Sequence, residues 1–286
     1  MASVRFTTLV LTLVALGAFA ANSLLTRMAL APRAIDAASF TAVRLGAGAL
    51  VLCLIVLRPG GGTGGWREGG RGWTGPLALF AYAGPFTYAY LRIGAAVGAL
   101  LLFGSVQVTM IGWGILKGER PRLLVWLGLV LAVGGLVFLL WPSGARPDLV
   151  GSSLMVFAGL AWGIYSLHGR RAPRPLPSNA RSFLLAFPFA AAVLWIDRAH
   201  VAVTTTGLWL AAVSGAVTSG LGYAAWYRAL PQLSATTAAV VQLSVPIVAA
   251  FGAVVVLNET PSARLVGASI IVLGGVGLAI AGRRAR

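Results

Sequence analysis

The sequence has 286 residues, of which 58% are hydrophobic and only 10% are charged, and its mean hydropathy is +0.89. A soluble domain carries about 25% charged residues, so this composition excludes an ordinary soluble domain and predicts an integral membrane protein. The net charge of +16 does not indicate nucleic-acid binding, because the basic residues are scattered through short loops and form no patch.

Ten apolar segments can be drawn along the chain, of which the third and the seventh are the weakest. They cover residues 6–29, 36–57, 74–91, 95–116, 123–141, 149–168, 181–196, 207–227, 233–257 and 264–281. A bilayer core of about 30 Å is crossed by roughly 20 apolar residues in a helix. The sequence therefore predicts an all-α integral membrane protein with ten transmembrane helices. The two longest loops, 59–74 and 170–181, are too short for a soluble domain.

The basic residues predict how these spans are oriented. If the N-terminus is cytoplasmic, fifteen Lys and Arg residues fall in inside loops and six in outside loops, with Arg44 left within a span. Cytoplasmic loops of membrane proteins carry an excess of Lys and Arg. We therefore expect both termini in the cytoplasm and a location in the bacterial inner membrane.

The chain repeats itself at a nearly constant spacing. The stretch AFAANSLLTR at 18–27 aligns with AWGIYSLHGR at 161–170, and Glu119 with Pro121 matches Glu259 with Pro261. The first segment also resembles a signal peptide, but residues 18–27 have a counterpart at 161–170 in the second half, which favours a transmembrane span of the mature protein. Because five spans, an odd number, separate the copies, we expect two inverted five-helix repeats, residues 1–145 and 146–286. Glycines in the fifth and tenth segments, such as Gly128 and Gly275, predict close helix packing.

The ninth segment contains a proline at mid-membrane depth. Leu233 to Leu257 carries no formal charge, and Pro246 lies within it. Proline removes a helical hydrogen bond, here the one to the carbonyl of Gln242. An opened backbone at this depth is tolerated only against protein or a water-filled cavity. We expect Pro246 to act as a helix break or gate beside a cavity.

The duplicated halves, the Trp162-Gly163 pair, Arg44 in the second span, and the block from Leu230 to Glu259 together resemble the drug/metabolite transporter superfamily in its EamA-type branch. The resemblance covers the whole chain, and the aromatic-rich third, sixth and eighth spans look most like the aromatic amino-acid exporters of that branch. It implies a substrate cavity between the halves, lined by spans one, three, four, six, eight and nine.

Aromatic and polar residues inside the expected spans are the candidates for lining this cavity. They are Phe19, Asn22, Tyr82, Phe86, Gln107, Trp113, Trp162, Tyr165, Ser219, Tyr223 and Gln242. Aromatic rings can stack on a flat substrate, and their polar tips can orient it. Alternatives remain: Trp162 can belong to an interfacial belt, and Gln107 and Gln242 can simply bond a neighbouring helix. Trp113 and Gln107 lie on different faces of one helix, so only one of those faces can line the cavity.

Arg44 is the single charge expected within the membrane. It can attract a substrate carboxylate, or it can snorkel or bond backbone carbonyls, and the structural role is favoured. No carboxylate is expected at mid-membrane, which favours transport without proton coupling. No cofactor or metal site is indicated.

The sequence predicts a transporter and no enzyme, since a His-Glu-x-x-His motif and a Gly-x-Ser-Gly motif are both missing. We expect export of small amphipathic metabolites, aromatic or other neutral amino acids above all, by alternating access. A proton-coupled exporter of drugs, nucleosides or other metabolites and a passive channel remain as alternatives. The expected partners are a small-molecule substrate and membrane lipid, with no nucleic acid, and the protein is expected to be a monomer or a homodimer.

Overall fold

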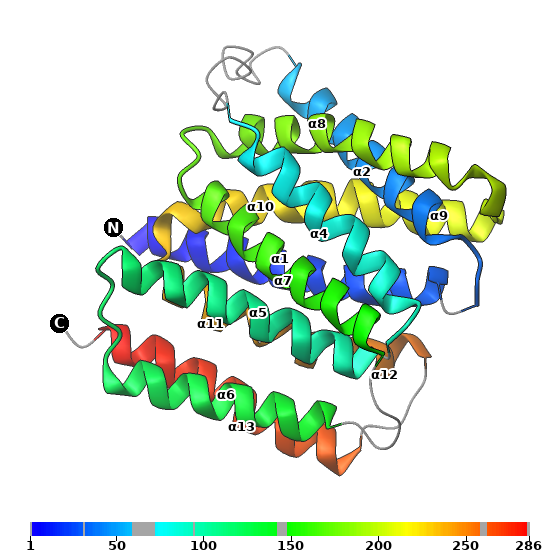
Figure 1. The fold of residues 1–286 in the computed structure, drawn as a ribbon. Coiled ribbons are helices and arrows are strands. Elements are labelled where there is room, and N and C mark those ends of the chain that lie inside the picture. Colours follow the sequence, from blue (N-terminus) through cyan, green and yellow to red (C-terminus); the bar gives the residue numbers. More distant parts are fainter. Residues whose placement is uncertain are drawn as a thin grey trace.

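The computed structural model describes residues 2–30, 32–58, 72–93, 95–141, 148–257 and 262–284, and all regular structure in these ranges is helical (Figure 1). The helices of the first part of the chain are α1 (Ala2–Leu30), α2 (Ala37–Val56), α4 (Thr74–Tyr90), α5 (Ala95–Leu116) and α6 (Leu123–Leu140). The later ones are α7 (Leu149–Arg170), α8 (Pro175–Ile196), η1 (Arg198–His200), α9 (Thr205–Val213), η2 (Ser214–Leu221), α10 (Gly222–Ala229), η3 (Leu230–Gln232), α11 (Ala235–Gln242), α12 (Val245–Leu257) and α13 (Ala263–Arg284).

Eight helical stretches of the described chain are long and apolar enough to cross a membrane, and Leu123–Leu139 forms a shorter apolar helix. The stretch Thr205–Gln232 counts as one of the eight because α9, η2, α10 and η3 follow one another without a gap. Several sequence features lie outside the described residues: Glu259 and Pro261 of the repeat, the boundary between 145 and 146, and the basic residues Arg67, Arg71, Arg146 and Arg286.

Side-chain caps fix where several helices begin. Asp36 accepts a hydrogen bond from the backbone N–H of Ser39 (2.8 Å), and Asp148 accepts one from that of Gly151 (2.6 Å). Ser234 caps α11 in the same way. The first N–H groups of a helix have no partner within it, so a short polar side chain at this position stabilises the start of the helix.

The start of α8 differs from the sequence expectation. Residues 170–181 were expected to form a loop, but α8 begins at Pro175. The proline-rich sequence is compatible with a helix here because the first-turn N–H groups are unpaired in any helix. Pro177 therefore removes no hydrogen bond that the helix needs.

Two stretches depart from regular α-helix near the centre of the molecule. The ninth apolar segment is divided into α11 and α12, with Leu243 and Ser244 in a turn between them and Pro246 as the second residue of α12. The residues between α9 and α10 form a π-helix, η2, which the sequence did not predict. Such wide turns often occur at functional sites because they change the direction of side chains.

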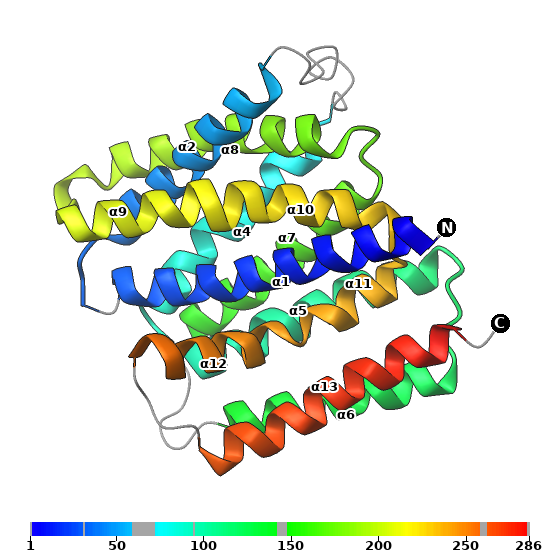
Figure 2. The same ribbon diagram turned by 180° about the vertical axis from the view of Figure 1, so that it is seen from behind.

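Helices from before residue 141 pack mainly on helices from after residue 148. Helices α4 and α5 both pack on α7, α2 packs on α8 and η2, α1 on α10 and α12, and α6 on α13. The pair α6 and α13 lies side by side at one edge of the bundle in both views (Figures 1 and 2). The start of α1 and the end of α13 lie at the same end of the bundle.

Glycines let α6 and α13 approach closely. A Cβ atom on Gly128 would collide with the carbonyl oxygen of Gly275 and with Ala279, whereas one on Gly134 would have nothing within 4 Å. Gly128 therefore contacts the partner helix, and Gly134 faces away from it.

We predict that Gly128→Val lowers the thermal unfolding midpoint of the purified protein, because overpacking a tight contact costs about 1–3 kcal/mol. Gly134→Val is the matched control and should leave the midpoint nearly unchanged. Equal midpoints for the two variants would show that the α6–α13 contact does not limit stability.

Candidate functional site

Five aromatic residues from four helices meet in the middle of the bundle. We call Phe19, Tyr82, Phe86, Trp162 and Tyr223 the aromatic box. The ring of Trp162 lies 4.8 Å from those of Tyr82 and Tyr223 and 5.2 Å from that of Phe19, measured between centroids. Trp162 thus contacts rings from both parts of the chain.

The box surrounds a small cavity of about 30 Å³. It is lined by the aromatic box together with Asn22, Ser23, Leu102, Phe103 and Val245. A space this small holds no more than a few water molecules. In this conformation the box therefore has no room for a metabolite, and we call this state closed.

Arg44 lies against Tyr82, Phe86 and Tyr223 of the box and is only 1% exposed. Its Nε donates to Ser219 Oγ (2.8 Å), and one terminal nitrogen donates to the hydroxyls of Tyr223 (2.6 Å) and, more weakly, Tyr82 (3.4 Å). The guanidinium also lies 5.4 Å from the ring centroid of Tyr82 and 5.7 Å from that of Phe86. Arg44 therefore neither snorkels nor bonds backbone carbonyls; it bonds hydroxyl groups beside the cavity.

The π-helix η2 brings Ser219 to this position. A Cβ on Gly215 would collide with the backbone carbonyl of Arg44, so η2 and α2 touch at backbone distance. The hydroxyls of Ser214 (2.7 Å) and, at a longer distance, Thr218 (3.4 Å) donate from η2 to the amide oxygen of Asn22. Sequence reasoning found Asn22 and Ser219 but missed the π-helix that connects them.

A fixed hydrogen bond orients Trp162. Its indole N–H donates to the amide oxygen of Gln242 (2.7 Å), whose nitrogen donates to the carbonyl of Ala238 (2.8 Å). Gln242 is fully buried and does not line the cavity. Its role in this structure is to hold the central ring, and the break after it leaves Val245 at the cavity wall.

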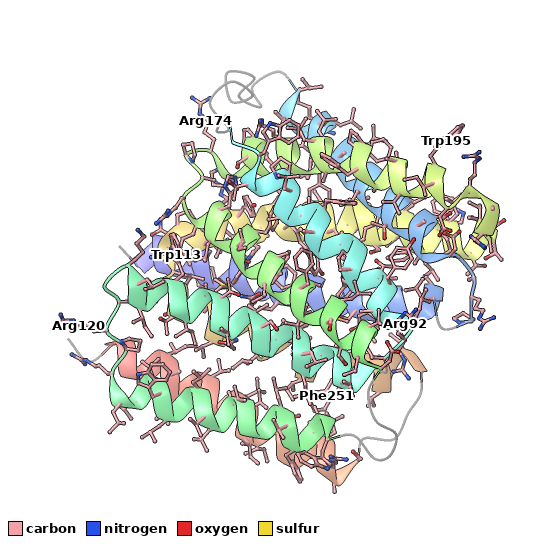
Figure 3. All side chains as sticks on the ribbon, viewed as in Figure 1. Arg92, Trp113, Arg120, Arg174, Trp195 and Phe251 are labelled. Carbon is pink, nitrogen blue, oxygen red and sulfur yellow. The ribbon has the colours of Figure 1, made fainter. Side chains whose placement is uncertain are left out.

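Four other candidates lie outside the cavity lining, among them Ser219, which bonds Arg44. Gln107 donates to the carbonyl of Ala239 (2.9 Å), and Tyr165 bonds Asn179. Trp113 lies toward the end of the bundle that carries the termini (Figure 3), where Lys117 and Arg171 lie over its ring. On α5 the cavity is lined by Leu102 and Phe103, which precede Trp113 and Gln107 along the helix, so the two candidates lie at the wrong height.

A polar cluster lies at the same end of the bundle, between the ends of α5 and α7 and the start of α11. Glu119 accepts hydrogen bonds from the backbone N–H groups of Ala235 (2.8 Å) and Thr236 (3.1 Å) and from the Thr236 hydroxyl (2.8 Å). Arg170 lies 3.5 Å from the carboxylate and donates to the carbonyl of Leu233. We call this cluster of Glu119, Arg170, Ala235 and Thr236 the Glu119 clasp.

Three larger hollows lie away from the box and share no lining residue with its cavity. One, of about 690 Å³, lies at the opposite end and is bordered by Arg27, Asp36, Tyr90 and Asp197 among others. A second, of about 450 Å³, lies between α11 and the α6–α13 pair, beside the Glu119 clasp. The third, of about 600 Å³, lies between α1, the start of α8 and α10.

A sequence family matches the second part of the chain. Residues 149–281 match the EamA-like transporter family. The threonine/homoserine exporter RhtA of Salmonella typhimurium is 30% identical over 247 residues, which cover 79% of this chain and 76% of the exporter. The chain belongs to the EamA-like transporter family.

One further relative and one solved structure match this EamA-like chain over nearly its whole length. An uncharacterized protein of Pseudomonas aeruginosa is 49% identical over 283 residues, covering 98% of this chain and 96% of that protein. A solved crystal structure shares the fold, with a TM-score of 0.83 and 20% identity, covering 98% of this chain and 99% of that one. The expected resemblance to aromatic amino-acid exporters is not confirmed.

The Glu119 clasp predicts a pH-dependent stability. Burial alone would raise the pKa of the Glu119 carboxyl, but the hydrogen bonds from Thr236 and Ala235 and the charge of Arg170 outweigh burial and hold the pKa below its usual value. The ionised carboxylate therefore stabilises the folded state. This contribution is complete above the ordinary pKa of a glutamate and is lost as the pH falls through the lowered pKa of the folded state.

We expect Glu119→Gln to lower the free energy of unfolding by about 1–2 kcal/mol at neutral pH, since hydrogen bonds to a charged group are replaced by weaker ones. The difference between the two proteins should stay constant from pH 7 down to the ordinary pKa of a glutamate, about 4.3, and should shrink below it, as measured by thermal unfolding between pH 7 and about pH 2.5. A difference that does not shrink at the acid end of this range would contradict the role of the ionised carboxylate.

Proposed function

We propose that this EamA-like transporter is a ten-span exporter of neutral amino acids in the bacterial inner membrane. It works by alternating access between two inverted halves, residues 1–145 and 146–286, without proton coupling. The aromatic box carries the proposal, because it lies in the middle of the bundle and combines rings from both halves.

The ten proposed spans are the eight long apolar stretches and two shorter helices, α4 and α6. Helix α4 packs on α7 and α8 in the interior of the bundle. A helix among other helices can be less apolar than one that faces lipid. In support of the orientation, Arg120 and Arg174 lie at the end of the bundle with the termini, and Arg92 lies toward the other end (Figure 3).

The closed box supports alternating access over a passive channel. A channel needs a continuous water path, whereas the cavity here has a volume of only about 30 Å³. In the proposed cycle the halves separate around the box first on one side and then on the other. The Glu119 clasp ties α5 of the first half to α11 of the second and closes the cytoplasmic side in this state.

The positions of the carboxylates support transport without proton coupling. Among the described residues, Asp36 and Asp148 cap helices, Glu119 belongs to the clasp, and Asp197 lies at the end of α8. None of them lines the central cavity. Proton relays in carriers usually consist of such groups within the membrane.

The choice of neutral amino acids rests on the relatives and on the box. RhtA is named as an exporter of threonine and homoserine. Rings and hydroxyl groups side by side suit a molecule with one apolar and one polar end. Threonine, homoserine and the aromatic amino acids are therefore the first substrates to test.

Removal of the central ring should abolish transport. In liposomes with the purified protein, we expect saturable uptake of labelled threonine or phenylalanine that does not depend on a proton gradient. Trp162→Ala should reduce it at least tenfold, because the ring contacts both halves. Trp162→Phe, which keeps a ring but loses the N–H, should be intermediate.

The control is Trp195→Ala, which removes an exposed tryptophan far from the box (Figure 3) and should leave uptake unchanged. A labelled nucleoside serves as the alternative substrate. Uptake of the nucleoside alone would contradict the substrate assignment, and uptake that follows the proton gradient would contradict the uncoupled mechanism.

The proposed topology places residues 117 and 198 on opposite sides of the membrane, since α6, α7 and α8 lie between them. In a Cys53→Ala background, a membrane-impermeant maleimide should label Arg198→Cys in intact cells. Lys117→Cys should be labelled only after the membrane is permeabilised. Labelling of both from one side would show that one of the three helices does not cross.

A further inference from the structure

Arg44 is a buried cation that forms no ion pair with any carboxylate of the described chain. Its three hydrogen-bond partners, Ser219, Tyr82 and Tyr223, are neutral hydroxyls. We propose that its counter-charge is the substrate: when the halves separate, the carboxylate of the transported molecule binds Arg44 together with the hydroxyls of Tyr82 and Tyr223. This inference rests on the proposed transport function and assigns the anionic end of the substrate to a defined place.

Burying the charge of Arg44 is costly. A charged side chain at the centre of a bilayer is strongly unfavourable unless it is paired. Asp36, on the same helix, is eight residues away and caps the N-terminus of α2, about 12 Å along the axis. Hydroxyl groups solvate the guanidinium of Arg44 but leave its full positive charge uncompensated.

Arg44 also has a hydrogen-bond donor that is not used in this structure. The terminal nitrogen Nη1 of Arg44 is buried and has no hydrogen-bond partner, although Nε and Nη2 are both bonded. Buried polar groups without a partner are rare and costly. A guanidinium is shaped to donate two parallel hydrogen bonds to a carboxylate, which would use this free group.

The two tyrosines connect Arg44 to the cavity. Both residues line the central cavity, and both hydroxyls contact the same nitrogen of Arg44. The Tyr223 hydroxyl donates toward that of Tyr82 (3.4 Å). An anion that Arg44 attracts from the cavity therefore meets these two hydroxyl groups beside the cation.

The same contacts connect binding to the proposed motion. Arg44 and Tyr82 belong to the first half of the chain, and Ser219 and Tyr223 to the second, so the bonds of Arg44 cross between the halves. When the halves separate, Arg44 loses its hydrogen bonds to Ser219 and Tyr223. A substrate carboxylate that enters at that moment takes the place of these neutral groups and pairs with the positive charge of Arg44.

The experiment compares each acid with its amide, which has nearly the same shape but no negative charge. Binding is measured by the thermal shift of the purified protein and by competition with uptake. The probes are threonine and threoninamide, phenylalanine and phenylalaninamide, and 3-phenylpropionate and its amide. The variants are Arg44→Gln and Arg44→Lys, with Arg198→Gln as the control for loss of an exposed arginine.

We expect the unmodified protein to prefer each acid over its amide by at least tenfold. Arg44→Gln should remove this preference by weakening only the acid, Arg44→Lys should keep part of it, and Arg198→Gln should keep all of it. Equal losses of acid and amide binding in Arg44→Gln would show a purely structural role and overturn the inference. The absence of any acid preference in the unmodified protein would also overturn it.

Two further measurements keep the test decisive. If Arg44→Gln does not fold, Tyr82→Phe removes one hydroxyl and keeps the ring, and it should weaken the acids and spare the amides. If no amino acid binds, the proposed function fails, and 3-phenylpropionate against its amide tests the carboxylate site alone. A preference for 3-phenylpropionate that depends on Arg44 would uphold the inference, and no preference would overturn it.

Discussion

The interior of a bilayer offers no water to pair with a charge or with a backbone amide, and this constraint shapes the whole structure. The described chain forms helices that satisfy their own backbone groups, and its carboxylates lie at helix ends, where they cap or fasten neighbouring segments. Arg44 is the exception. The residues that solvate it, Ser219, Tyr82 and Tyr223, are the same residues that join α2 and α4 to η2 and α10.

The aromatic box and its supports form one connected system. Gln242 holds Trp162 from the end of α11, and the Glu119 clasp holds the beginning of the same helix. Helix α11 is thus fixed at one end to the central ring and at the other to α5 and α7. A change in the clasp can therefore reach the box through a helix of only eight residues.

Much of this arrangement was predictable from the sequence, and the failures have physical reasons. Apolar length predicted the helices, and the counterpart positions of Phe19 and Trp162 pointed to two residues that the structure brings into contact. Periodicity shows which residues share a face but not which neighbour that face meets, so Gln107 and Trp113 could not be placed. The start of α8 at Pro175 was missed because prolines read as a loop until their position in the first turn is known.

The small size of the cavity within the aromatic box has a consequence for the movement of protons. Protons cross membranes along chains of hydrogen-bonded water, and a space of about 30 Å³ between rings leaves little room for such a chain. No carboxylate among the described residues lines this space to carry a proton. In this conformation the aromatic box therefore offers a proton neither a wide water path nor a carboxylate among its described lining residues.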